Sequence, residues 1–83
     1  MEIGRKIYYE KTNGVVIWDK GEMSGSVVET TFEEDIIAFP MLTLILPEQL
    51  GIKQLAYGEL AANFSVCKGY RVDPQAEEIE FVY

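Results

Sequence analysis

The sequence contains no histidine in its 83 residues, which excludes every mechanism that needs an imidazole as base, nucleophile or metal ligand. It contains one cysteine, Cys67, so an internal disulfide is excluded and a reducing compartment is favoured. No apolar run reaches the roughly 18 residues of a membrane span. The first residues, Met1 to Lys6, lack the apolar core of a secretion signal. We therefore expect the protein in the cytoplasm, with no membrane partner.

Basic residues are also scarce, since 7 Lys and Arg stand against 14 Asp and Glu, for a net charge of −7. Binding to a phosphate backbone needs clustered Lys and Arg, so we do not expect a nucleic-acid partner. The charge is compatible with a basic protein partner or with an acidic mimic of nucleic acid. A hydrophobic fraction of 48% is typical of a globular protein, and the length predicts a single domain over 1–83.

The cysteine, the acidic groups and the glycine-containing loop, which can form catalytic or binding sites, each have a structural explanation in this sequence. Cys67 has no histidine to activate it, and we interpret it as a buried structural thiol on a helix. The acidic groups 33–35 and 77–80 lack the spacing of a calcium loop, and the loop 21–26 lacks the glycine spacing and lysine of a phosphate loop. We predict no catalytic residue, no metal and no cofactor. A small enzyme that uses paired carboxylates is the least favoured hypothesis, since nothing in the sequence points to it. The sequence does not exclude it, because the distance between two carboxylates depends on the tertiary structure.

The largest hydrophobic mass lies in the stretch 30–47, which opens with the pattern of a helix start. Thr30 or Thr31 can cap a helix from about Phe32, and Glu33 or Glu34 stands three residues on, as a capping box requires. The acidic residues at 33–35 suit the positive end of the helix dipole. Apolar residues then follow at helical spacing on one face, namely Phe32, Ile36, Phe39 and Leu46.

Pro40 interrupts this pattern. A proline inside a helix removes one hydrogen bond and disfavours helical angles at the preceding residue, here Phe39. We predict that the helix kinks or stops at Pro40 and that a second short helix runs over 41–46. A strand over 41–46 is the alternative, although Leu and Met favour a helix. The residues 41–46 are apolar on nearly every side, so they either press into a sheet with Met41 or Ile45 partly exposed or form a docking patch.

Alternating and turn-rich segments on either side predict strands. Residues 5–11 and 15–19 form a hairpin around Asn13-Gly14, with Ile7 and Tyr9 on one face and Tyr8 on the other. Both faces of this hairpin are expected to be covered. Further along we predict a short extended segment at 27–28, a turn at 48–50 and a break at Gly51. A third strand is predicted over 52–57, followed by a helix over 59–68 that Gly69 terminates. The chain is predicted to end in a hairpin of 70–72 with 78–83.

Aromatic residues are numerous for a chain of this length. Packing in the core and on the sheet explains them, and the alternative is that several form one surface patch, where Tyr and Trp act as interface anchors. The aromatic residues in question are Tyr8, Tyr9, Trp18, Tyr57, Tyr70 and Tyr83. Together with the apolar stretch, they give the candidate interface Trp18, Tyr8, Met41, Leu44 and Ile45.

The hairpin 4–19, with Val28-Glu-Thr-Thr31, Tyr57-Gly58 and Gly69-Tyr-Arg-Val-Asp-Pro74, resembles a group of small uncharacterised proteins of bacteriophages and prophages of Gram-positive bacteria. That group is typically encoded near tail genes. The resemblance covers nearly the whole chain, but its motifs are turn and strand residues, so it implies a phage setting and transfers no site. Pro40 and the leucine-rich run after it are more apolar than the group leads us to expect.

We therefore expect an α+β fold in the order ββαβαββ, with one mainly antiparallel sheet of two hairpins and a short strand, packed against two helices on one face. The expected function is non-enzymatic. The protein would act through protein–protein interaction as a minor tail or assembly component or an accessory factor. Its partner would be a second copy, forming a homodimer, or a phage or host protein, in the host cytoplasm or the virion. The alternative is an acidic inhibitor or regulator of a host nucleic-acid-binding protein.

Overall fold

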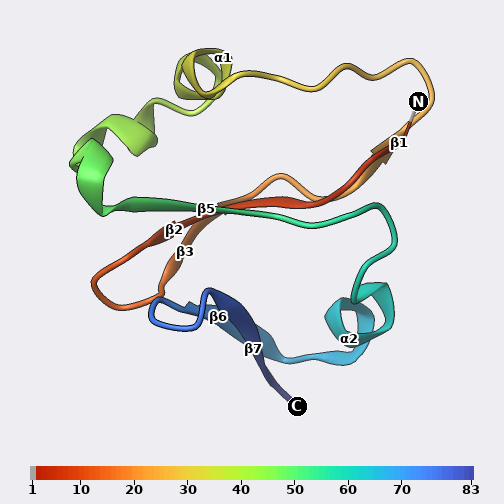
Figure 1. The fold of residues 1–83 in the computed structure, drawn as a ribbon. Helices are drawn as coiled ribbons and strands as arrows, with labels where there is room; N and C mark the ends of the chain where they lie inside the picture. The colour runs from red at the N-terminus through yellow and green to blue at the C-terminus, as the bar shows by residue number, and fades with distance from the viewer. Residues whose placement is uncertain (1) are drawn as a thin grey trace.

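A computed structural model describes residues 2–83, and its centre is a three-stranded antiparallel sheet in the order β3–β2–β5 (Figure 1). The strands are β2 (Lys6–Glu10), β3 (Val16–Asp19) and β5 (Leu50–Gln54). The predicted first hairpin is confirmed, and Gly14 takes a φ of 76° at its turn. The third strand begins at Leu50, two residues earlier than predicted, and pairs with the central strand β2.

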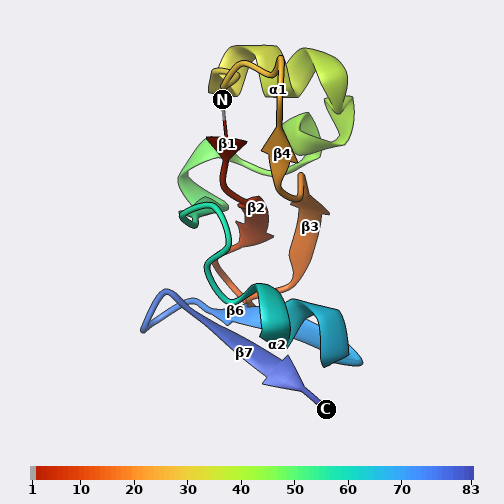
Figure 2. The same ribbon diagram turned by 90° about the vertical axis from the view of Figure 1, so that its right-hand side faces the viewer.

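Two further strand pairs lie outside the central sheet. β1 (Glu2–Ile3) pairs with β4 (Met23–Ser24), while β6 (Gly69–Asp73) pairs with β7 (Glu78–Val82). The α+β class and the antiparallel pairing are confirmed, but the two predicted hairpins belong to separate sheets. The two helices also lie on opposite sides of the central sheet rather than on one face (Figures 1 and 2). The alternation within each strand was correct, and only the way the hairpins combine differs.

The segment after β4 forms α1 (Phe32–Ala38) and two 3₁₀ helices, η1 (Pro40–Leu44) and η2 (Pro47–Gln49). Thr31 is the N-cap, and it forms the predicted capping box with Glu34. The break predicted at Pro40 is confirmed, because α1 ends at Ala38 and Phe39 leaves helical angles with φ −138°. The second helical piece is a 3₁₀ helix that ends at Leu44, and no strand forms over 41–46. The extended segment predicted at 27–28 is not a strand, whereas β4 lies in the predicted loop 21–26.

The second helix is shorter than predicted. α2 spans Ala61–Val66, because Leu60 at its N-cap takes a left-handed φ of 58° and Cys67 is extended. Gly69 does not terminate the helix, since it is the first residue of β6. The closing hairpin is confirmed, and its turn is stabilised by Asp73, whose Oδ1 accepts a hydrogen bond from the backbone N–H of Gln75.

The central sheet is covered on both faces, as predicted for its first hairpin. Tyr8 packs against residues of α1 and η1, whereas Ile7 and Tyr9 pack against residues of α2 and the β6–β7 hairpin. These elements lie on opposite sides of the central sheet (Figure 1). The first core cluster consists of Tyr8, Leu42 and Leu50, with Ile17, Trp18, Phe32, Ile36, Phe39 and Ile45 packed against it. The second consists of Ile7, Tyr9, Leu55 and Val72, with Val16, Phe64, Tyr70 and Ile79 packed against it.

Gly51 does not break the chain but is a buried residue of β5, directly opposite Tyr9. A Cβ at position 51 would overlap the Tyr9 ring. We expect Gly51→Ala to lower the free energy of unfolding by about 1–3 kcal/mol, measured by urea denaturation, because the buried ring has to move. Gly69→Ala is the control: a Cβ there meets no atom within 4 Å, so its effect should stay within about 0.5 kcal/mol. Equal effects of the two substitutions would contradict this packing.

Candidate functional site

The structure separates the five predicted interface residues. Met41 and Leu44 are 55% and 78% exposed, and Ile45 is half-buried against the core. Tyr8 is 0% exposed, so the prediction that it anchors an interface is wrong. Trp18 is half-buried, and its ring stacks on Tyr8 at 5.8 Å and meets Phe39 edge-on at 4.9 Å, so both aromatic residues serve the core.

The 3₁₀ geometry of η1 explains which of its side chains are exposed. With three residues per turn, positions i and i+3 lie on the same side of the helix. Leu42, 1% exposed, and Ile45 therefore face the sheet, whereas Met41 and Leu44 face away from it. Exposed apolar side chains also occur before and after η1, at Ile37 on α1 and at Leu46. We call these four exposed residues, Ile37, Met41, Leu44 and Leu46, the outer apolar surface.

The sequence around the outer apolar surface is strongly acidic. Residues 21–52 contain six of the fourteen acidic residues and none of the seven basic ones, so this segment carries nearly all of the net charge of −7. Four of these acids are exposed, namely Glu29 in the segment before α1, Glu33 and Glu34 on α1, and Glu48 on η2. The apolar side chains therefore belong to a segment with negative surface charge and no positive charge of its own.

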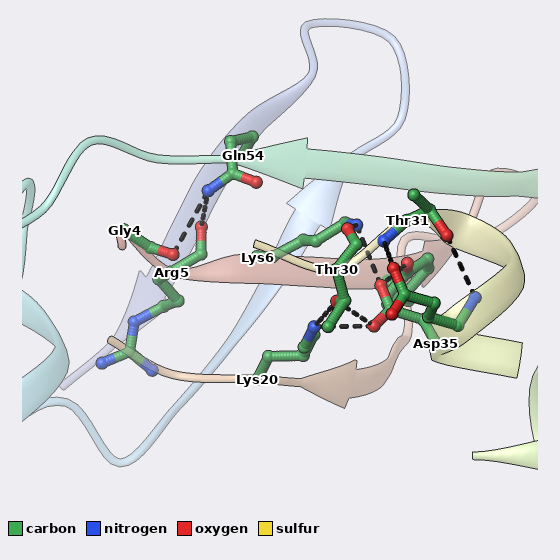
Figure 3. Close-up of polar contacts among 10 residues, drawn as sticks. Gly4, Arg5, Lys6, Lys20, Thr30, Thr31, Asp35 and Gln54 are labelled. Atoms are coloured by element: carbon green, nitrogen blue, oxygen red, sulfur yellow. Dashed lines mark hydrogen bonds and ion pairs between the residues drawn. The ribbon is translucent and has the colours of Figure 1, made fainter. Parts of the chain in front are cut away.

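Beneath this segment, a buried carboxylate fastens α1 to the central sheet. Asp35 on α1 is 1% exposed, and its Oδ2 accepts hydrogen bonds from Tyr8 Oη and, at 2.9 Å, from Lys6 Nζ (Figure 3). Its Oδ1 accepts from Lys20 Nζ at 2.6 Å and from Thr30 Oγ1 at 2.5 Å. These donors come from β2, from the end of β3 and from the segment that leads into α1. We call Asp35 with these four donors the Asp35 cluster.

The Asp35 cluster shifts the pKa values of its members. Burial alone would raise the pKa of Asp35, but hydrogen bonds from Lys20, Lys6, Thr30 and Tyr8 outweigh it and hold this pKa well below its usual range. For Lys6, burial opposes the charged form, yet the hydrogen bond to Asp35 raises its pKa above the ordinary value. Burial and the hydrogen bond to Asp35 raise the pKa of Tyr8. The carboxylate and the ammonium group are therefore both charged at neutral pH.

Asp35 was predicted only to be a helix-start charge, and its role as a buried ion-pair partner was not predicted. One signal pointed to burial: Asp35 lies three residues after Phe32 and four before Phe39, on the apolar face of α1. A second signal was the strand alternation, which places Lys6 on the same face of β2 as Tyr8. The pairing itself, across separations of 15 to 29 residues, is a property of the tertiary structure.

A pocket of about 220 Å³ lies next to the Asp35 cluster. Its polar lining includes the side chains of Lys6 and Lys20, which are 17% and 11% exposed. Gln54, at the end of β5, also lines the pocket, and its Nε2 donates to the carbonyl oxygens of Gly4 and Arg5 at 3.2 Å each (Figure 3). The remaining lining residues are Ile3, Gly4, Met23, Glu29 and Thr30.

Other reactive groups have structural surroundings. The thiol of Cys67 is half-buried rather than fully buried as predicted, and its Sγ lies 3.5 Å from the carbonyl oxygen of Phe64. Across residues 2–83, no three or more Cys, Asp and Glu side chains are grouped so that they could hold a metal ion. Among the helices of residues 2–83, none has the length and hydrophobicity to cross a membrane.

Comparison of the chain with known proteins found no similar protein. No protein-family model, no curated protein and no solved structure matches the chain. The features of the chain that bear on its function are the outer apolar surface, the acidic segment 21–52 and the Asp35 cluster.

Proposed function

We propose that this protein is a non-enzymatic interaction protein that binds another protein through the outer apolar surface. The observation that carries the proposal is the split of η1 into a buried and an exposed apolar side. Leu42 and Leu44 stand two residues apart, one 1% and the other 78% exposed. The four residues of the outer apolar surface are each more than half exposed and lie within one ten-residue stretch of the chain, 37–46. An extended exposed apolar area marks an interaction site more often than a single exposed side chain does.

The charge of the segment favours a different protein over a second copy as the partner. Two copies that met through this surface would bring together two segments that lack basic residues and carry exposed Glu33, Glu34 and Glu48. Like charges across an interface oppose association, whereas a positive rim on the partner would favour it and speed the encounter. We therefore propose a partner with an apolar groove bordered by Lys or Arg.

The resemblance to small phage and prophage proteins supports a phage setting for this partner. In that setting the partner would be a tail or assembly protein. This chain would then be a minor tail component, an assembly factor or an accessory factor. The acidic segment supports a second candidate, an inhibitor or regulator of a host nucleic-acid-binding protein, whose phosphate-binding surface would supply the basic rim. The identity of the captured partner distinguishes the two.

The test compares three tagged baits in lysate of cells that produce the protein naturally: the wild type, Leu44→Glu and Val66→Glu. Leu44 and Val66 are similarly exposed, at 78% and 67%, but Val66 lies on α2, on the other side of the sheet. We expect Leu44→Glu to weaken binding of the purified partner about tenfold or more, and Val66→Glu to leave binding unchanged. The wild-type complex should also weaken as salt is added.

Three results would contradict the proposal. The first is equal binding of the partner by wild type and Leu44→Glu, with both folded by circular dichroism. The second is a complex that is insensitive to salt, which would mean that no basic rim on the partner contributes to binding. The third is a salt-stabilised homodimer that Leu44→Glu dissociates, which would make a second copy the occupant of the surface.

A further inference from the structure

The pocket beside the Asp35 cluster has unused hydrogen-bond donors. An ammonium group carries three N–H donors. Lys6 Nζ donates to Asp35 and to the carbonyl oxygen of Thr30, whereas Lys20 Nζ donates to Asp35 and to Thr30 Oγ1. The third N–H of each ammonium group has no hydrogen-bond acceptor within residues 2–83, and both lysines line the pocket. Lys6 Nζ also lies 5.3 Å from the centre of the Tyr8 ring, and Lys20 Nζ lies 5.5 Å from the centre of the Trp18 ring. The two ammonium groups face one buried carboxylate, so this side of the pocket keeps a net positive charge.

The rest of the pocket lining supplies one carboxylate and some apolar side chains. Glu29 is exposed and forms no ion pair with any residue of the described part of the chain, so its carboxylate is available as an acceptor. The half-buried Met23 and, to a small extent, Ile3, which is 5% exposed, add a small apolar area from the β1–β4 pair. The pocket thus combines a positive side, a single carboxylate and a small apolar edge. Its volume of about 220 Å³ is that of a site for a metabolite rather than for a drug-sized ligand.

We propose that this pocket binds a small zwitterion, an α-amino acid with an apolar side chain. Its carboxylate would accept the free donors of Lys6 and Lys20, its ammonium group would donate to Glu29, and its side chain would contact Ile3 and Met23. A phosphate or dicarboxylate fits less well, because Glu29 repels it and Asp35 already neutralises one lysine. A simple cation is repelled by the two lysines. A neutral ligand leaves the charged donors without an acceptor.

This inference does not depend on the proposed protein partner, because the pocket and the outer apolar surface share no residue. The test is a titration of ¹⁵N-labelled protein followed by NMR, with three ligands of the same shape. Leucine carries both charges, 4-methylpentanoate lacks the ammonium group, and leucinamide lacks the carboxylate. We expect leucine to shift the backbone amides of Ile3, Lys6 and Met23 at the lowest concentration, and leucinamide to bind weakest.

The variant Glu29→Gln isolates the ammonium contact without touching the buried lysines. We expect it to weaken leucine binding about two- to fivefold, as the loss of an exposed ion pair does, and to leave 4-methylpentanoate bound as tightly or more tightly. Glu78→Gln, an exposed change on β7 outside this pocket, should alter neither. The proposal is overturned if leucine shifts none of the pocket amides, or if leucine and 4-methylpentanoate bind equally and Glu29→Gln changes neither.

Discussion

Replacing Asp35 with alanine is expected to lower the free energy of unfolding by about 3–5 kcal/mol, because it leaves two lysines beneath α1 without their carboxylate. Lys6 and Lys20 have side chains only 17% and 11% exposed, and Tyr8 Oη loses its acceptor as well. Since small domains are stable by roughly 5–15 kcal/mol, such a loss is a large part of the total. Urea denaturation followed by tryptophan fluorescence measures it, because Trp18 stacks on Tyr8.

The control for Asp35→Ala is Glu33→Ala, an exposed acidic residue of the same helical turn. Its interaction with the helix dipole is worth about 0.3–1 kcal/mol, so its effect should be several times smaller. If both substitutions cost the same, Asp35 acts only as a helix-start charge, and its ion pairs contribute nothing to stability.

The depressed pKa of Asp35 also predicts how this stabilisation depends on pH. A carboxyl group whose pKa is lower in the folded than in the unfolded state stabilises the fold fully above its unfolded pKa of about 3.9. The stabilisation is lost as the pH falls from there toward the folded-state pKa. The difference in unfolding free energy between wild type and Asp35→Asn should therefore be constant from neutral pH to about 5 and shrink below about 4. A difference that grows on acidification would contradict the pKa shift.

Truncating Leu42 to alanine is expected to cost about 2–5 kcal/mol of unfolding free energy, whereas the same truncation at Leu44 should change it by no more than about 0.5 kcal/mol. Both leucines belong to η1, but Leu42 packs on Tyr8 and Leu50, while Leu44 is 78% exposed. Chemical denaturation of both variants measures the contrast. Similar losses would mean that the outer side of η1 is covered by the protein itself, and the outer apolar surface would not exist.

Local structure followed from the sequence where short-range chemistry decides it. The capping box of Thr31 and Glu34, the break at Pro40 and the hairpin at Gly14 each depend on residues within a few positions of one another. The apolar residues on both faces of the strand 15–19 correctly predicted that both faces of the first hairpin are covered. These features need only backbone geometry and the period of each element.

What the sequence did not predict depends on contacts between distant segments. Gly51 looked like a break, yet the ring of Tyr9 requires a glycine opposite it in the sheet. Tyr8 looked like an interface anchor, yet its hydroxyl group donates to a carboxylate 27 residues away. Asp35 was predicted only to complement the helix dipole, but it is buried, because Lys6 and Lys20 compensate its charge. Each error came from judging one residue without its partner.

The most direct test of the proposed interaction is photo-crosslinking in the producing cells, with a photoreactive amino acid placed at position 44 or, as the control, at position 66. Our account predicts that position 44 crosslinks to one protein with a basic surface, in a complex that free wild-type protein competes away, and that position 66 does not. Crosslinks from position 44 only to a second copy of the chain, or the same crosslinks from both positions, would contradict it.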